Sequence, residues 1–191
     1  MSNIETHLSL DLPDWLPDEL ASFPVLADQT ARIDAVNRLA SRNVREQTGG
    51  PFAALVVNRE GVILSAGVNL VTTSGISSAH AEVVALGLAH RKLGTWDLSS
   101  HDLELVSSCE PCAMCTGAVL WSGVRSLVYS ASGEDARRIG FDEGDKTTDW
   151  ADGLRRRGIA VTGPVQRDQG ARVFEHYLNA GGKVYNSGSN R

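Results

Sequence analysis

Apolar residues recur at intervals of three and four between positions 29 and 46, and polar residues fill the positions between them. The recurring set is Ile33, Val36, Leu39, Ala40 and Val44. This spacing predicts an amphipathic helix with one buried face. A similar stripe near the C-terminus predicts a final helix, and its members are Val173, Phe174, Tyr177 and Leu178.

Short apolar runs bounded by turn residues predict strands. Residues 52–57 and 62–66 are separated by Asn58-Arg59-Glu60-Gly61, whose composition is typical of a tight turn. We therefore expect these two runs to form a β-hairpin. The other strands that we expect lie at residues 103–107, 124–130 and 159–162.

Two further helices are expected at residues 79–93 and 112–121, both rich in small and apolar side chains. Ser77 or Ser78 is a candidate cap for the first of them. A strand, a helix and a strand in succession imply a parallel strand pair with a right-handed crossover. Both helix starts then lie at the same edge of the sheet, where open α/β sheets bind ligands.

The chain is predicted to contain one globular domain. We expect residues 28–186 to form it, residues 1–27 to be an N-terminal arm or short helix on the surface, and residues 187–191 to be a tail. The polar, glycine-rich stretch at residues 131–157 is expected to be irregular, apart from a short helix near 134–139. Long irregular connections of this kind are usually functional or mobile.

Composition narrows the classes of function. The 191 residues are 42% hydrophobic and 21% charged, with a formal net charge of −5, and this balance argues against nucleic acid as a partner. Three cysteines do not indicate a disulfide scaffold, and a reduced, cytoplasmic compartment fits them best. The sequence shows no signal peptide and no apolar run that is long enough for a membrane span.

The candidate chemistry lies in His80-Ala81-Glu82 and in Pro111-Cys112-Ala113-Met114-Cys115. Together they match H-x-E … P-C-x-x-C, the signature of zinc deaminases that act on nucleobases. Cys112 and Cys115 can face one ion from a single helical turn, and Pro111 suits the start of that helix. The positive end of the helix dipole favours both thiolates. His80 completes a set of three ligands for one Zn²⁺.

Three protein ligands leave one position open, which is the arrangement of a catalytic zinc rather than a structural one. Zinc makes a bound water acidic near neutral pH. Glu82 follows the histidine ligand by two residues, and its carboxylate can take the proton of that water and return it to a substrate. The alternative is a closed structural site in which Cys109 is a fourth ligand and Glu82 is an ordinary surface charge. On the catalytic pattern, Cys109 is a small buried hydrophobe at a strand end.

From about Thr30 to Asn186 the sequence resembles bacterial guanine deaminases of the cytidine-deaminase superfamily. The matching motifs are Gly49-Gly50-Pro51-Phe52, Asn69, Thr72-Thr73-Ser74, Ala79-His80-Ala81-Glu82, Ser107 to Cys115, Gly117-Ala118, Trp121 and Gly140-Phe141-Asp142-Glu143. The resemblance implies a three-layer α/β/α sandwich around a mixed five-stranded sheet, a homodimer and a nucleobase pocket.

The resemblance also implies further site residues. A planar base would stack near Phe52 and Trp121, Asn69 would hydrogen-bond it, and backbone amides near Ala81 would contact it. Glu143 matches a carboxylate that contacts the amidine face of guanine, formed by N1–H and the 2-amino group. The alternatives are a loop charge for Glu143, a turn residue for Asn69 and core packing for the two aromatic residues. Three residues are further candidates for closing the pocket, namely Trp150, His176 and Tyr185.

We therefore predict a zinc-dependent aminohydrolase that converts guanine to xanthine and ammonia, with Glu82 and Glu143 as catalytic residues. Amino-triazines share the amidine edge of guanine and are plausible additional substrates. The alternatives within the same enzyme class are cytosine deaminase and tRNA-adenosine deaminase. An alternative from a different class is a non-catalytic binding module that zinc stabilises.

Overall fold

A computed structural model describes residues 4–186 and 188, so the predicted tail at residues 187–191 lies outside the described residues except for Gly188. Five strands form one sheet in the order β2-β1-β3-β4-β5. Their bounds are β1 Ala53–Val57, β2 Ile63–Val68, β3 Glu104–Cys109, β4 Ser126–Ala131 and β5 Ala160–Thr162. The helices are α1 Leu16–Ala21, α2 Gln29–Arg45, α3 Val71–Ser74, α4 Ala81–Leu93, α5 Ala113–Ser122, α6 Gly133–Arg138, α7 Trp150–Arg156 and α8 Arg167–Asn179.

The sheet is mixed, as the sequence predicted. Strand β1 pairs antiparallel with both β2 and β3, whereas β3, β4 and β5 run parallel to one another. The start of β1 therefore lies next to the ends of β2 and β3, all at the same end of the strands. Three important positions follow from this arrangement, because Phe52 directly precedes β1, Asn69 directly follows β2 and the P-C-x-x-C motif follows β3.

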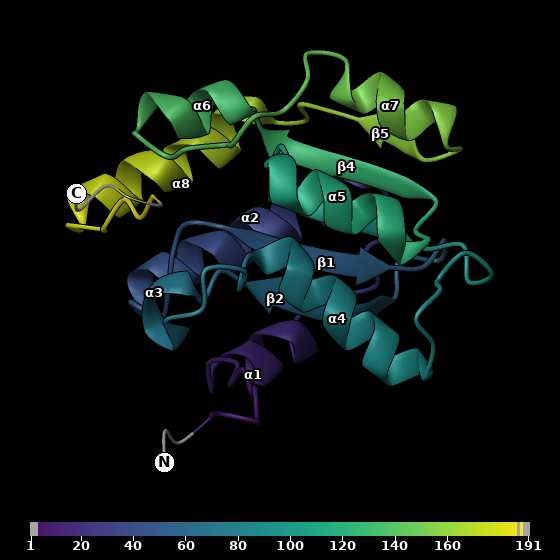
Figure 1. The fold of residues 1–191 in the computed structure, drawn as a ribbon, viewed down its shortest axis with the longest axis horizontal. Coiled ribbons are helices and arrows are strands. Elements are labelled where there is room, and N and C mark those ends of the chain that lie inside the picture. The colour runs from purple at the N-terminus through teal and green to yellow at the C-terminus, as the bar shows by residue number, and fades with distance from the viewer. Residues whose placement is uncertain (1–3, 187, 189–191) are drawn as a thin grey trace.

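Helices cover both faces of the sheet, with α2 and α8 on one side and α4 and α5 on the other (Figure 1). Alternate residues of a strand point to opposite faces. Ala53, Leu55 and Val57 accordingly belong to the core cluster beneath α2 and α8, while Ala54 and Val56 belong to the one beneath α4 and α5. The predicted three-layer α/β/α sandwich is confirmed, and both of its cores are apolar.

The N-terminal segment contains helix α1, which packs against the sandwich. Leu16 is buried in the core, and the carboxylate of Glu19 is buried between the guanidinium groups of Arg38 and Arg42 on α2. These cations lower the pKa of Glu19 more than its burial raises it. The described part of the arm is therefore tied to α2 by an apolar anchor and an ion-pair cluster.

Three local predictions were wrong. Neither Ser77 nor Ser78 caps α4, because His80 occupies its N-cap position and no side chain caps it. Residues 150–156, expected to be irregular, form the short helix α7, and residues 71–74, which lie in a stretch from Asn69 to Ser78 that its Thr, Ser and Gly content predicts to be a loop, form the short helix α3. Both helices are too short to show a clear apolar period. No helix within the described residues has the length and hydropathy that a membrane span requires.

Candidate metal centre and active site

The three candidate metal ligands come from the starts of two neighbouring helices. His80 is the N-cap residue of α4, Cys112 is the N-cap residue of α5, and Cys115 lies in the first turn of α5. Helices α4 and α5 lie side by side on one face of the sheet (Figure 1). The strand order therefore brings residues more than thirty positions apart in the sequence to one point.

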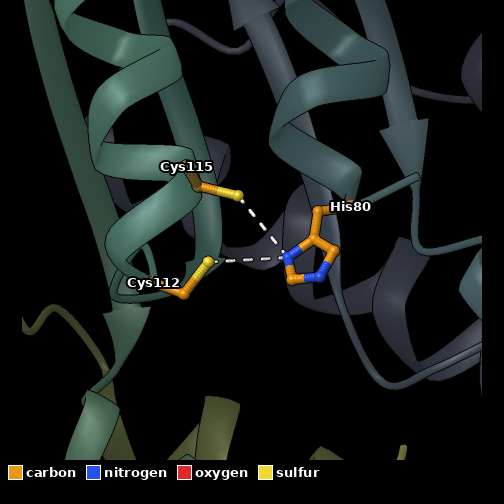
Figure 2. Close-up of side chains that lie close together, drawn as sticks. All are labelled: His80, Cys112 and Cys115. Atoms are coloured by element: carbon orange, nitrogen blue, oxygen red, sulfur yellow. Dashed lines mark hydrogen bonds between the residues drawn. The ribbon is translucent and has the colours of Figure 1, made fainter. Parts of the chain in front are cut away.

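The donor atoms of these residues converge (Figure 2). The sulfurs of Cys112 and Cys115 each lie 3.6 Å from Nδ1 of His80, and all three donor atoms lie within 4.8 Å of one another. Typical Zn–S and Zn–N bond lengths place sulfur and nitrogen about 3.6 Å apart in a tetrahedral centre. The residues present thus fit Zn²⁺ in both spacing and chemistry.

Hydrogen bonds within the donor group favour a thiolate at Cys112 and raise the pKa of Cys115. A hydrogen bond from Cys115, which outweighs the effect of burial, and a weaker contribution from His80 together lower the pKa of the Cys112 thiol to about 4. Burial lowers the pKa of His80, but Cys112 and Glu82 raise it by more, so the net shift is upward. The chain alone therefore stabilises a thiolate at Cys112, and a thiolate is the form that ligates zinc.

Cys109 is not part of the donor group. Among residues 4–186 and 188, the group that could hold an ion comprises His80, Cys112 and Cys115. The buried thiol of Cys109 is directed at the carbonyl oxygen of Ser132, 3.7 Å away, and burial raises its pKa well above its usual value. The geometry therefore favours three protein ligands with one open position over the closed structural site.

Glu82 lies beside the donor group without belonging to it. It sits in the first turn of α4, is 7% exposed, and accepts a hydrogen bond of 3.4 Å from the hydroxyl of Ser107 on β3. Burial raises its pKa, as does the negative charge of Cys112. A carboxyl group with a raised pKa next to a metal site is suited to exchanging protons with a substrate.

A cavity of about 480 Å³ opens next to these groups, a volume in the usual range for small-molecule sites. The lining comprises Phe52, Asn69, Val71, Ser77, His80, Glu82, Cys109, Glu110, Cys112, Ala113, Met114, Phe141, Asp142, Glu143, Gly144, Tyr185 and Asn186. The lining combines three aromatic rings, those of Phe52, Phe141 and Tyr185, with the metal donors and several carboxyl groups. The cavity can therefore bury an aromatic molecule and present polar groups to its edge.

Glu143 brings a second carboxyl group into this cavity. Its side chain is buried, and its Oε2 atom has no hydrogen-bond partner among the described residues. Burial raises its pKa to about 8, and the negative charge of Cys112 acts in the same direction. An orphaned polar atom in a buried position costs free energy, so a ligand with N–H donors would satisfy it.

Phe52 and Asn69 both line the cavity, as the sequence predicted for a base-binding pair. The ring of Phe52 meets that of Phe141 edge to face, with the centroids 5.1 Å apart. Asn69 is 1% exposed, and its Oδ1 accepts a hydrogen bond from the amide of Val71. The side chain of Asn69 also stabilises the turn after β2, so the turn and the binding interpretations are compatible.

Two predicted contact residues lie elsewhere. Trp121 is 85% exposed at the end of α5 and does not line the cavity of its own chain, so its stacking on a bound base stays a prediction. Nine residues of helix separate it from Cys112, a rise of about 14 Å. Ala81 lies in sequence between the lining residues His80 and Glu82, but its own side chain is buried in the core. Only its backbone therefore remains a candidate contact.

The C-terminal segment supplies cavity residues that sequence reasoning assigned poorly. Tyr185 was one of three candidates for closing the pocket, and it does line the cavity. Trp150 instead packs on Tyr129, and His176 is exposed on α8. Asn186 was missed, although it lines the cavity. Its side chain accepts a hydrogen bond from the amide of Asp142 and donates one to the carbonyl of Gly140. No local pattern marks such a residue.

Comparison with known proteins identifies the site. The family model described as the cytidine and deoxycytidylate deaminase zinc-binding region matches residues 28–131. The chain is 43% identical to the solved guanine deaminase of Nitrosomonas europaea, over 93% of this chain and 100% of that one, with a TM-score of 0.87. A mutant protein solved in complex with 8-azaguanine is 44% identical over 91% of this chain and 98% of that one, with a TM-score of 0.86.

Guanine deaminase of Bacillus subtilis is 44% identical over 105 residues, a match that spans 55% of this chain and 65% of that protein. The chain belongs to the family of zinc-binding cytidine and deoxycytidylate deaminases. The predicted zinc cofactor and the predicted hydrolytic deaminase class are thereby confirmed, as is the resemblance to bacterial guanine deaminases.

Proposed function

We propose that this protein hydrolyses guanine to xanthine and ammonia, with Zn²⁺ held by His80, Cys112 and Cys115. The observation that carries the proposal is the buried carboxyl of Glu143, whose Oε2 has no hydrogen-bond partner in the described part of the chain and which shares one cavity with Glu82 and the metal donors. Guanine presents N1–H and its 2-amino group together on one edge, and this edge complements a carboxylate.

Each polar group has a distinct task in this reaction. When bound, Zn²⁺ supplies the Lewis acid that activates water at this site. Glu82 accepts a proton from the attacking water and delivers it to a ring nitrogen, while the water oxygen forms a bond to C2. The bond from C2 to the amino nitrogen then breaks. The second water proton leaves with the amine as ammonia, and xanthine remains.

The remaining cavity residues bind and orient the base. Phe52 would stack on the ring without reading its edge, and Asn69 would hydrogen-bond it. The backbone near Ala81 is a further contact that we propose, since the first amides of a helix have no partner within the helix. Glu143 would fix the edge that carries the amino group, and a base that lacks those donors would leave its carboxyl unpaired.

The test is an ammonia-release assay on the zinc-loaded protein with guanine, cytosine, an amino-triazine and an adenosine-containing tRNA anticodon stem. We expect guanine to be the fastest substrate and an amino-triazine to be turned over more slowly. Turnover of cytosine or tRNA in preference to guanine would contradict the proposal and would indicate a cytosine deaminase or a tRNA-adenosine deaminase. A protein that binds zinc but releases no ammonia would be a binding module.

We further expect a homodimer in a reduced, cytoplasmic compartment, with a small nucleobase rather than nucleic acid as partner. Trp121 and Met114 expose apolar surface on α5, which supports a contact with a second copy. The two cysteine donors must stay reduced to ligate zinc. Light scattering on the parent protein and on Trp121→Asp tests the dimer, and a monomeric parent would exclude it.

A further inference from the structure

The segment that carries Glu143 has little secondary structure of its own. It runs from the end of α6 to the start of α7, and residues 141–144 line the cavity. One backbone hydrogen bond of 2.9 Å, from the amide of Ala113 to the carbonyl of Glu143, joins this segment to α5. The side chain of Glu143 does not help to hold this segment in place through its Oε2 atom, which has no hydrogen-bond partner among the described residues.

A lysine three residues further along, whose side chain is largely buried, makes a second attachment, on the side facing the metal donors. The ammonium of Lys146 lies 2.5 Å from a carboxylate oxygen of Glu110 and 2.7 Å from the carbonyl oxygen of Pro111. The side chains of Lys146 and Glu110 are only 8% and 15% exposed. The ammonium also lies 4.7 Å from the centre of the Trp150 ring. The ammonium, whose side chain is largely removed from water, thus contacts a carboxylate, a carbonyl and an aromatic ring.

The acceptors of Lys146 are themselves fixed to the metal centre. Glu110 and Pro111 directly precede Cys112, and the amide of Glu110 donates to the carbonyl of Ala131 at the end of β4. The other carboxylate oxygen of Glu110 accepts a hydrogen bond from the amide of Gly133. Lys146 thus joins the Glu143 segment to the rigid turn that presents a zinc ligand.

We propose that Lys146 is a positioning residue that holds the carboxyl of Glu143 at a fixed place relative to the metal. Displacement of a binding group by about 1 Å can cost two orders of magnitude in rate. Lys146 does not line the cavity, so it acts through Glu143 and not on the substrate. This inference rests on the proposed role of Glu143.

The test is a double-mutant cycle on the zinc-loaded protein with Lys146→Met and Glu143→Ala. We expect Lys146→Met to lower kcat/KM for guanine by about 10- to 100-fold, to weaken 8-azaguanine binding, and to keep one zinc per chain. In the Glu143→Ala background the same change should have less than a threefold effect on either quantity. The matched control is Lys92→Met, since Lys92 also donates to a carbonyl, that of Leu64, but is exposed and at the far end of α4.

The outcomes separate this inference from the proposed function. Equal losses in the two backgrounds, or loss of zinc in Lys146→Met, would overturn the positioning role. A Glu143→Ala variant as active as the parent would instead refute the role of Glu143. If Lys146→Met does not fold, Glu110→Gln replaces it, because this change removes the ion pair and retains the shape. Its loss of kcat/KM should be several-fold and should also vanish without Glu143.

Discussion

The hydroxyl of Ser107 on β3 donates a hydrogen bond to the carboxylate of Glu82 at the start of α4, across the interface between the sheet and the helix. Both side chains are buried. A strand residue thus orients the carboxylate that we expect to move protons, while the helix that carries this carboxylate also presents His80. The acid–base group and a metal ligand are positioned by one rigid unit.

Glu82→Gln should retain zinc and lose most of its turnover. The amide has nearly the same shape but cannot accept and return a proton, a function that typically contributes about 10²- to 10⁴-fold. Ammonia release and metal analysis on the same sample check this. Ser107→Ala is the control for orientation, and we expect it to cost only several-fold. A Glu82→Gln variant that keeps the parent rate would remove Glu82 from the mechanism.

Glu143→Ala should act on guanine more than on a base without an adjacent N–H and amino group. The reason is that the buried carboxyl lacks a partner in the described chain, so the substrate supplies one. Steady-state kinetics with guanine and with cytosine, whose amino group is next to a ring nitrogen without hydrogen, measure kcat and KM separately. Asp145→Asn is the matched control, since it removes an exposed carboxylate from the same segment. Equal kinetics for parent and Glu143→Ala would make Glu143 a bystander.

Cys109→Ser should keep about one zinc per chain and near-parental activity, whereas Cys112→Ser should lose most of its metal. The difference follows from geometry, because the thiol of Cys109 faces the carbonyl of Ser132 and that of Cys112 faces His80. Metal analysis after dialysis and a thermal unfolding curve check both variants. Removal of zinc from the parent by a chelator should abolish ammonia release, and added Zn²⁺ should restore it. Metal loss in Cys109→Ser would instead support the closed structural site, in which Cys109 is a fourth zinc ligand.

The ion pair between Asp135 and Arg167 should stabilise the fold above about pH 4. Two hydrogen bonds from Arg167, of 2.8 and 3.0 Å, lower the pKa of Asp135 well below its ordinary value of 3.8. A depressed pKa gives stability that is present above the unfolded value and is lost as the pH falls through the folded one. We expect Asp135→Asn to cost about 1.5–3 kcal/mol at pH 7.

The loss caused by Asp135→Asn should begin to shrink as the pH falls below about 4, because the carboxylate then takes up protons in the unfolded chain while it stays ionised in the folded one. Urea unfolding of both proteins across pH 3–7 measures the difference. Glu134→Gln is the control, because Glu134 contacts the same arginine at 3.4 Å but is 71% exposed. A loss for Asp135→Asn that does not vary with pH would contradict the assignment.

The sequence predicted best those features that chemistry or periodicity constrains. His80, Cys112 and Cys115 could be predicted because zinc ligation imposes residue types and spacings, and α2 because its apolar stripe is long. Helices α3 and α7 were missed, since four and seven residues cannot establish a period. The exposed position of Trp121 could not be predicted, because a motif match does not show which way a helix residue faces. Asn186 reaches the cavity through tertiary folding alone.

The connection between α4 and β3 has a practical consequence. Helix α4 starts at the metal centre and β3 ends beside it, so residues 94–103 lie at the opposite end of the sheet. Six residues of strand place them about 20 Å from the chemistry. Trp96 in this loop is 84% exposed. A fluorophore or a tether to a solid support can be attached at this position without obstructing the mouth of the cavity, which makes the loop a handle for building a guanine sensor.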